Sequence, residues 1–295
     1  MRSLRSLLLA FWRRMRSSGK FMTGVVLLAV LVALALLSPL ISTFVGDGKN
    51  PLEIAAYPAW EVPSVDHWLG TDRYGRDVMV MTLAGLGTSL KVGVVAGIIS
   101  TFIGVTIAFV GGYKGGRLDS TLRTATDMFL VVPSLPLLLT LSAYVKRVSV
   151  IQIAVLLAIF SWPFAARTLR SHVLSLRSRP YVELARVTNC SDLEIIFQDL
   201  VPNLLPYIGV GLAAASLGAI FALTGLEVIG LGPANTIDLG LMINWATSWG
   251  ALSLGAWPIF VAPIVVLSLL FMAVTMINIG MEEVYNPRLR ATAGA

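Results

Sequence analysis

The side chains that most often carry out chemistry in proteins are few in this sequence and lie far apart. There is one cysteine, Cys190, which excludes an internal disulfide, and the two histidines, His67 and His172, are distant from each other. No G-x-x-x-x-G-K-[ST] string is present, so the chain has no P-loop for a nucleotide phosphate. No nucleophile, base and orienting residue occur together at motif spacing. The sequence therefore predicts no catalytic residue, no metal site and no cofactor bound by this chain, and it argues against a membrane enzyme.

The polar residues with the clearest pattern lie in 181–202, YVELARVTNCSDLEIIFQDLVP. Good helix formers follow Pro180, which suits the first turn of a helix. Asn189 stands where that helix would stop, and asparagine tolerates the left-handed conformation that ends helices. Ser191 and Glu194 then fit the S-x-x-E capping box that opens a second helix. The pattern predicts two short helices separated by a left-handed turn.

The second short helix is predicted to be amphipathic. Leu193, Ile196 and Phe197 share one face by i, i+3, i+4 spacing, while Asp192 points away from it. Pro202 is expected to prevent this helix from continuing unperturbed into the next segment. A helix this short is marginal in water, so its apolar face must pack on the protein's own spans, on the lipid interface or in a groove of another protein.

The composition surrounding this segment belongs to a membrane protein. Of 295 residues, 56% are hydrophobic and 13% charged, against about 25% charged in soluble domains, and the mean hydropathy is +0.82. A polar stretch covers 45–78, and 79–110 exceeds the length of one span, so part of it is expected to lie along the interface. The apolar runs are 22–44, 79–110, 122–144, 149–166, 204–231 and 256–279.

Basic residues give these six runs an orientation. With both termini inside, the inner loops and termini hold sixteen of the 22 lysines and arginines, as the positive-inside rule requires. The net charge of +6 is explained in this way and needs no nucleic acid. The sequence predicts an all-α polytopic membrane protein with six transmembrane helices, N-in and C-in. Its parts are a cytoplasmic basic segment 1–21, a first transmembrane helix 22–44, an extracytoplasmic segment 45–78, a five-helix core 79–285 that includes 181–202, and a cytoplasmic tail 286–295.

The spans contain few ionisable residues. Asp127 and Glu227 are the main acidic candidates, and both lie toward span ends, which makes an ion-coupled secondary transporter the weaker alternative. Glu227 either lines the mouth of a pathway or hydrogen-bonds to backbone groups that have no helical partner at the end of its span. Small residues at about four-residue spacing in 93–104 and 209–225 predict close helix packing or a sliding helix interface, and Pro133 predicts a kink.

The segment 181–202 resembles the cytoplasmic EAA loop of ABC-importer permeases, whose pattern is E-A-A, three residues, G, nine residues, I-x-L-P. Glu183 and Ala185 occupy matching places, and Pro202 stands at the distance of the final proline. Asn189 replaces the glycine, which the same left-handed turn accommodates. The more serious departure is Asp199, a charge where the family is usually apolar; whether it meets a basic residue on an ATPase is a hypothesis.

A second motif narrows the resemblance. LGTDRYGRDVM, 69–79, is similar to the L-G-T-D-x-x-G-R-D signature of the dipeptide/oligopeptide permease branch, and further similarities extend in order to about residue 290. This signature has two interpretations. It either contacts an extracytoplasmic binding protein or substrate, or forms a structural turn in which the glycines mark the bends and the aspartates accept hydrogen bonds from backbone N–H groups. The signature residues are Gly70, Thr71, Asp72, Gly75, Arg76 and Asp77.

The resemblance implies a type I importer fold and the C-type permease subunit of the complex, in the plasma membrane of a prokaryote. Implied partners are a second permease subunit, cytoplasmic ATPases that bind ATP and Mg, and a substrate-binding protein. The implied cargo is di- or oligopeptides, with oligosaccharides or nickel chelates as alternatives. The residues implied to couple to the ATPase are Glu183, Ala185, Asn189, Ser191, Asp192, Leu193, Glu194, Ile196, Phe197 and Pro202.

Overall fold

The computed structural model is helical in every regular element that it describes. It describes residues 15–45, 50, 52–134, 136–138, 140, 149–232 and 236–285. The predicted tail 286–295 lies outside these residues, as does most of the predicted N-terminal segment. Within the described ranges, the one β interaction is an isolated bridge between Thr71 and Asp77.

The apolar runs of the sequence form long helices. Five helices in the described residues are long and apolar enough to cross a membrane: α2, α3, α6, the continuous helix from α8 through α9, and α11. The elements are α2 (Gly19–Val45), α3 (Val78–Lys114), α4 (Gly116–Val131), α6 (Val150–Arg177), α7 (Pro180–Val187), α8 (Asp192–Ile195), the π-helical turn η1 (Ile196–Leu200), α9 (Val201–Val228), α10 (Leu239–Ser248) and α11 (Pro258–Tyr285).

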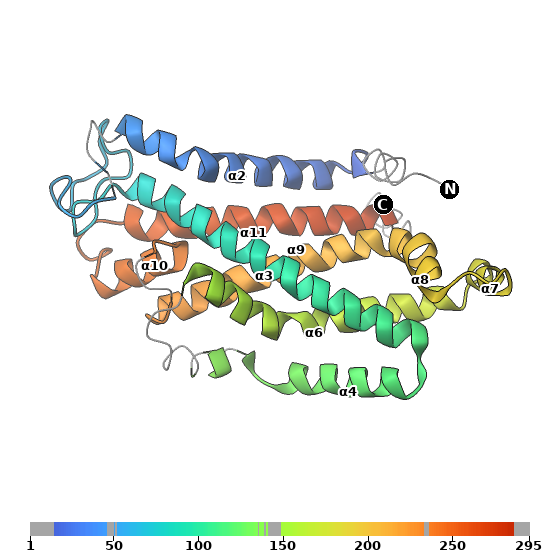
Figure 1. The fold of residues 1–295 in the computed structure, drawn as a ribbon. Helices are drawn as coiled ribbons and strands as arrows, with labels where there is room; N and C mark the ends of the chain where they lie inside the picture. The colour runs from blue at the N-terminus through green and yellow to red at the C-terminus, as the bar shows by residue number, and fades with distance from the viewer. Residues whose placement is uncertain are drawn as a thin grey trace, which may run out of the picture.

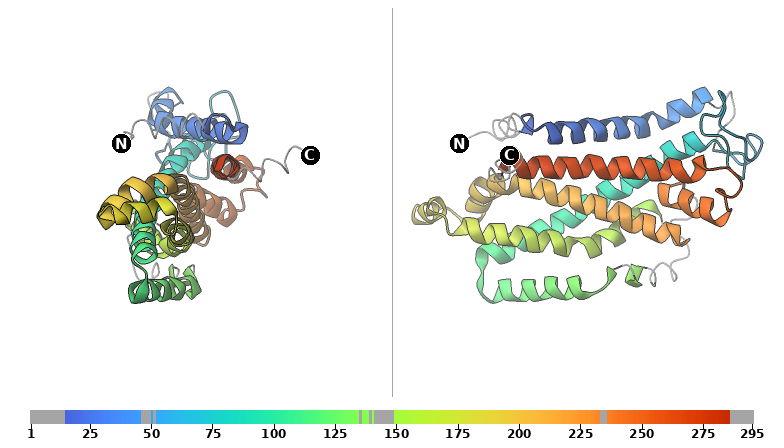
Figure 2. Two further views of the ribbon diagram at one scale, coloured as in Figure 1. Left: turned by 90° about the vertical axis from the view of Figure 1, so that its right-hand side faces the viewer. Right: turned by 180° about the vertical axis from the view of Figure 1, so that it is seen from behind.

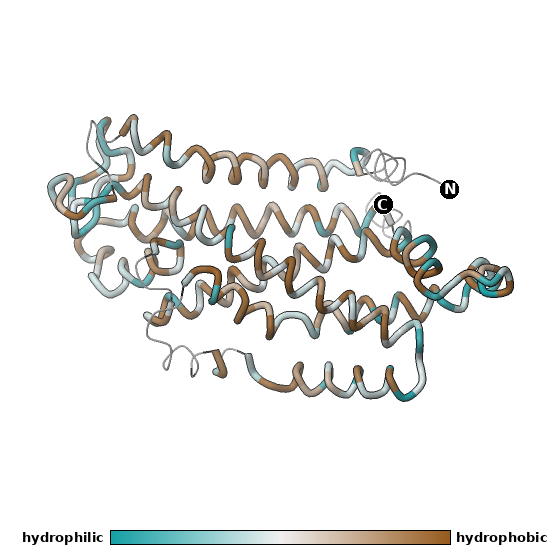
Figure 3. The backbone as a smooth tube through the Cα atoms, in the orientation of Figure 1, coloured by the Kyte–Doolittle hydropathy of each residue, from teal (hydrophilic) through white to brown (hydrophobic). Residues whose placement is uncertain are grey.

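The long helices lie side by side along one common direction (Figure 1). One end of the bundle carries residues 52–77 and α10; we call it the α10 end. The opposite end carries α7 and α8, and we call it the α7 end. The views in Figure 2 show that α2 begins and α11 finishes at the α7 end. Apolar residues dominate the helices between the two ends, and hydrophilic residues gather at the ends (Figure 3).

The predicted span 122–144 takes a different form from the other five. Helix α4 ends at Val131, and Val132 is extended with φ −71° and ψ 120°, as the residue before a proline prefers. Pro133 therefore ends the helix rather than kinking it. Between α3 and α6 the chain returns from the α7 end to the α10 end (Figure 1). Helix α4 is short and is not among the five apolar spans.

Two boundaries differ from the sequence prediction. Residues 78–114 form one continuous helix, which no proline or cap interrupts; that part of 79–110 lies along the interface stays a prediction. The run 149–166 extends to Arg177, because the residues beyond Ala166 are still good helix formers although they are polar. Helix α10 was not predicted; Asp238 caps it by accepting from the N–H groups of Gly240 and Leu241.

Helix α3 packs at the centre of the bundle against α6 and α9. Its glycines permit this: a Cβ at Gly97 would lie 2.1 Å from Ser216 Oγ, and one at Gly104 would lie 2.9 Å from Ala165 Cβ. Close helix packing, one of the two interpretations of these small residues, describes the α3 glycines.

Candidate functional site

The 180–202 segment forms the two short helices that its sequence predicts. Pro180 occupies the first turn of α7, and Asn189 has φ +58°, the left-handed conformation that ends a helix. The Asn189 N–H donates to Arg186 O and the Cys190 N–H to Ala185 O, both at 3.1 Å. These two bonds satisfy carbonyls that the end of α7 would otherwise leave open, so the turn has a defined geometry.

The predicted capping box is also present. The Ser191 N–H donates to Glu194 Oε2 at 2.8 Å, and the Glu194 N–H donates to Ser191 Oγ at 3.3 Å. Both bonds satisfy donors at the start of α8. Because turn and cap follow each other directly, α8 begins at a fixed place relative to α7.

The expected break at Pro202 is absent, and the chain continues from α8 through a π-helical turn into α9. The Val201 N–H donates to Ile196 O, five residues back, which widens the helix by one residue. Pro202 then stands in the first turn of α9, directly after the wider π-turn, which accommodates a residue with no N–H to donate. Helix α8 is therefore a rigid extension of α9.

The apolar side chains of α8 and η1 are divided between two surroundings. Ile195 and Leu200 are buried against α3, α6 and α7, and Ile196 is half-buried beside them. Leu193 and Phe197 are 67% and 66% exposed. The prediction of one face shared by Leu193, Ile196 and Phe197 was therefore wrong for Ile196, because the π-turn follows it and the spans lie beneath it. Two apolar side chains one helical turn apart face outward.

Side chains from two spans hold this segment in place. The Tyr113 hydroxyl donates to Asp192 Oδ1 at 3.1 Å, so Asp192 faces α3 and not open solvent alone. The Arg186 guanidinium stands 5.2 Å over the Tyr113 ring. Arg177 Nη1, at the end of α6, donates to Gly112 O at 2.8 Å. Glu183 and these charged groups line one polar depression at the α7 end.

The two departures from the EAA pattern occupy defined positions. Asn189 forms the turn, as described above. Asp199 is half-buried in η1, and its backbone carbonyl accepts from Asn203 Nδ2 at 2.7 Å. Burial raises the pKa of Tyr181, and the Asp199 charge adds to this shift. Asp199 therefore faces α7 within the same segment.

The 69–79 signature forms a tight loop at the α10 end. Gly70 and Gly75 have φ of +74° and +70°, and a Cβ at either would lie within 2.3 Å of a backbone oxygen of residues 57–61. Asp72 Oδ1 accepts from the N–H groups of Tyr74 and Arg76, and Arg76 Nε donates to Asp72 Oδ2 at 2.7 Å. These contacts are those of a structural turn.

Three more residues complete this loop. Asp77 caps α3 by accepting from the Val80 N–H at 2.9 Å, and its other oxygen lies 2.9 Å from His67 Nδ1. The Thr71 hydroxyl donates to Pro58 O at 2.7 Å. His67, one of the two histidines of the sequence, is therefore a partner of a helix cap. Most polar groups of the signature bond within this loop, as in a structural turn, although Arg76 Nη2 makes an ion pair with Asp72 and no hydrogen bond among the described residues.

Glu227 is 1% exposed near the end of α9 and faces α10. Its carboxyl group lies beside that of Asp238, which is also fully buried, and Glu227 Oε1 and Asp238 Oδ2 have no hydrogen-bond partner among the described residues. Two carboxylates this close in a buried site repel each other, so at most one of them is expected to carry a charge. A Cβ at Gly232 would lie 1.8 Å from Glu227 Oε1, so the Glu227 side chain would have to move to admit a larger residue there. Glu227 is therefore buried inside this chain beside a second carboxyl group.

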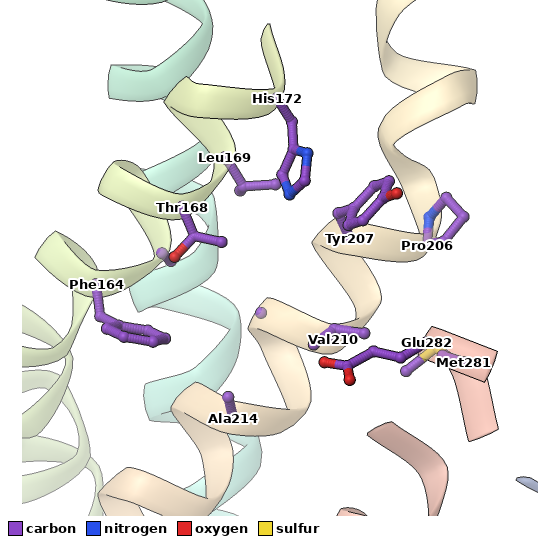
Figure 4. A pocket seen from close by; sticks show the side chains of 12 residues that line it. Phe164, Thr168, Leu169, His172, Pro206, Tyr207, Val210, Ala214, Met281 and Glu282 are labelled. Carbon is purple, nitrogen blue, oxygen red and sulfur yellow. The ribbon is translucent and has the colours of Figure 1, made fainter. Parts of the chain in front are cut away.

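A concave surface runs between α6 and α9. Figure 4 shows its half nearer the α7 end, where His172 of α6 faces Tyr207 of α9 and the rings stack with centroids 4.0 Å apart. This half adjoins a second hollow toward the α10 end, and both share Phe164 and Ala165. Each hollow holds about 320–340 Å³. The two hollows also share Gly211 and Ala214 of α9, and the second hollow continues along the small α9 residues Ala215, Gly218 and Ala222.

The glycines of α9 differ from those of α3. A Cβ at Gly211, Gly218 or Gly225 would meet nothing within 4 Å. These residues recur every seven positions, so they line one stripe of the helix. Close packing within this chain, one of the interpretations of 209–225, does not describe these three residues; Gly211 and Gly218 face the concave surface instead.

Several residues of these sites escaped the sequence analysis. Tyr113 and Asp192 are distant in sequence, as are Asp119 and Arg170, whose ion pair joins α4 to α6. No local periodicity encodes such pairs. For Asp238 a signal existed, since an aspartate two residues before a glycine opens an apolar run and suits a helix N-cap.

Comparison with known proteins agrees with this geometry. Residues 79–291 match the family described as "Binding-protein-dependent transport system inner membrane component". The oligopeptide transport system permease protein OppC of Mycobacterium bovis is 33% identical over 78% of both chains. The dipeptide transport system permease protein DppC of Bacillus subtilis is 32% identical over 95% of this chain and 85% of its own. OppC of Bacillus subtilis is 29% identical over 96% of this chain and 91% of its own.

The family match covers more than half of the chain and includes α3 from its second residue on, the 180–202 segment and the concave surface. Together with five helices that can span a membrane, it places the protein in the inner membrane with several passes. The chain belongs to the family of inner membrane components of binding-protein-dependent transport systems.

Proposed function

We propose that this chain is the non-catalytic permease subunit of an ATP-driven peptide importer, forming half of its pathway and coupling to its ATPase. The observation that carries the proposal is the 180–202 segment. A capped helix is held rigidly on the spans, yet it presents Leu193 and Phe197 outward. Exposed apolar side chains on a rigid helix suit a groove in another protein. The partner ATPase binds ATP and Mg and carries out hydrolysis.

The proposed topology has six crossings with both termini in the cytoplasm. Helix α2 begins at the α7 end and helix α11 finishes there (Figure 2). The chain between these two points must therefore cross the membrane an even number of times. The segment from Gly116 to Val150 supplies the sixth, since it starts and finishes at opposite ends of the bundle. Basic residues at the α7 end, including Arg177, Arg179 and Arg186, support its assignment to the cytoplasm.

The concave surface between α6 and α9 is proposed as this chain's wall of the translocation pathway. The glycines at positions 211 and 218 leave space for a solute without offering it a tight binding site. A second permease subunit would close the opposite wall. Movement of α8 reaches this surface directly, because α8, η1 and α9 are one continuous helix.

Peptide is the proposed cargo because the relatives that cover most of this chain are named oligopeptide and dipeptide permeases. Oligosaccharides and nickel chelates are the alternative cargoes. Ligand retention by the binding protein of the same system distinguishes them, since it presents the cargo to this chain.

The docking proposal is tested by charging the exposed apolar pair. The double variant Leu193→Asp/Phe197→Asp should insert normally but lose co-purification with the ATPase, because carboxylates cannot enter an apolar groove without a large desolvation cost. The matched control is Leu118→Asp. Leu118 is an exposed leucine of α4 at the α7 end of the bundle, outside the 180–202 segment. Normal recovery of the ATPase with the double variant would contradict the proposal.

A further inference from the structure

Lys91 is an exposed cation within a long apolar helix, α3. On the same stripe of α3 stand Val94, Ile98 and Phe102, which are 51%, 54% and 71% exposed. Beside Lys91, α2 and α3 enclose a mostly apolar groove of about 770 Å³. The stripe and the groove together form one unpartnered surface, which we call the Lys91 face.

The position of Lys91 across the bundle follows from a helix contact. A Cβ at Gly87 would lie 3.9 Å from Ala35 Cβ, so these residues are level with each other. Lys91 is one turn farther toward the α7 end, which places it level with about the middle of α2 (Gly19–Val45). The hydrocarbon core is about 30 Å thick, and a four-carbon stem does not cover the roughly 15 Å to either surface.

Nothing in the described chain neutralises this ammonium group. No ion pair of Lys91 with a described residue occurs. Of the neighbouring hydroxyls in the groove, Thr88 donates to Ala84 O in its own helix and Ser42 to Pro39 O. A cation at this depth is costly in lipid and requires an anion or water.

Lipid and a water-filled pathway both fit this face poorly. Lipid headgroups carry the membrane's anions, and they lie at its surfaces and not at its centre. The pathway is proposed along α6 and α9, and none of the residues lining that surface lines the groove beside Lys91. An apolar stripe with a single charge suits another transmembrane helix that carries one acidic residue.

We propose that the Lys91 face binds a transmembrane helix of the second permease subunit, and that a carboxylate of that helix pairs with Lys91. The inference rests on the proposed function for the existence of that subunit. A second copy of this chain does not fit, because its described acidic residues in or near the spans lie at other depths. Asp127 pairs with Arg123 and lies in one hollow with Ile107 of α3, several turns nearer the α7 end than Lys91, and Glu227 is near the α10 end.

The first experiment changes the charge in the complete importer, co-expressed with its second permease subunit. Lys91→Met should lower recovery of that subunit at least tenfold, because it leaves a carboxylate unpaired in the membrane. Lys91→Arg keeps the charge and should retain most of the recovery. The control Lys20→Met removes a cation at the α7 end, where Lys20 pairs with Glu283, and should leave recovery unchanged. Equal recovery with Lys91→Met overturns the proposal.

The second experiment identifies the neighbour directly and leaves Lys91 in place. Val94→benzoylphenylalanine, irradiated in native membranes, should form an adduct with the second permease subunit. Adducts with lipid alone, with another copy of this chain or with transported peptide each overturn the proposal. A parallel probe at Phe197 reports the ATPase contact. If the probe at Phe197 captures the ATPase but the probe at Val94 does not capture the second permease subunit, only the Lys91 inference is rejected. If the probe at Val94 captures the subunit but the probe at Phe197 does not capture the ATPase, the proposed coupling is rejected.

Discussion

The Tyr113 hydroxyl donates a 3.1 Å hydrogen bond to Asp192 Oδ1, which joins the last turn of α3 to the first residue of α8. Helix α3 starts at the Asp77 cap at the α10 end and reaches the α7 end without interruption. One continuous helix thus connects the 69–79 loop with the segment proposed to meet the ATPase. A displacement of α8 acts on α3 through this bond and on α9 through the main chain.

Removing the Tyr113–Asp192 bond should loosen coupling without preventing assembly. A hydrogen bond to a charged group contributes about 1.5–3 kcal/mol when it is buried and less when, as here, it is partly exposed. Tyr113→Phe should therefore lower peptide imported per ATP hydrolysed by about two- to fivefold in proteoliposomes, an order of magnitude set by that energy. Recovery of the ATPase should stay normal.

A double-mutant cycle separates this bond from general damage. Asp192→Ala should reproduce the effect of Tyr113→Phe, and the two together should cost no more than either alone. Asp192→Asn keeps an acceptor and should retain most of the coupling. Additive losses in the double variant would show that the two residues act independently.

The ion pair between Asp119 and Arg170 predicts a pH-dependent stability. Arg170 donates two 2.6 Å bonds to the Asp119 carboxylate, and this hydrogen bonding lowers the pKa of Asp119 despite its partial burial. A lowered folded-state pKa stabilises the fold above the ordinary carboxyl pKa of about 3.9, and this contribution is lost as pH falls through the folded-state value.

Asp119→Asn should accordingly lower the stability of the purified chain by about 1–2 kcal/mol at pH 7. The difference from the unchanged protein should shrink below about pH 4, where Asp119 starts to be protonated in the unfolded chain. Thermal unfolding in detergent at both pH values measures this. A difference that is the same at pH 7 and at pH 3 would rule out the ion pair as its cause.

Local signals in the sequence predicted much of this fold. The turn at Asn189 and the box formed by Ser191 and Glu194 depend only on neighbouring residues, and the structure has both. The five apolar spans follow from length and composition alone. The π-turn before Pro202 could not be predicted in this way. A proline after a polar helix predicts the end of that helix, and only the buried contacts of Ile195 and Leu200 with other helices indicate that it continues.

The remaining differences arise from contacts between distant residues. Glycines of α3 and α9 share the same spacing, yet Gly97 is packed against Ser216 while Gly218 faces open space. Periodicity shows that small residues share a face but not what that face meets. The Glu227–Asp238 pair depends in the same way on where α10 folds back.

Glu227 and Asp238 are expected to hold the end of α9 against α10. Glu227→Gln keeps a donor for Asp238 and should change the free energy of unfolding by less than about 1 kcal/mol. Glu227→Ala removes the neighbouring carboxyl group and leaves a cavity beside the buried Asp238 side chain, and should cost about 2–4 kcal/mol. Thermal unfolding of both variants measures the effect. Equal stability of the two would mean that the pair does not lock these helices.

Glycines on the two faces of the bundle should respond oppositely to the same substitution. Gly97→Ala brings a Cβ within 2.1 Å of Ser216 Oγ and should destabilise the chain by about 1–3 kcal/mol. Gly218→Ala meets nothing within 4 Å and should be neutral or stabilising by up to about 1 kcal/mol. Gly218→Leu and Gly218→Trp should then reduce transport progressively as the side chain fills the concave surface, while co-purification with the ATPase stays normal. If transport does not depend on side-chain size at Gly218, this surface is not part of the pathway. A bulky side chain on a surface that the solute passes would obstruct it.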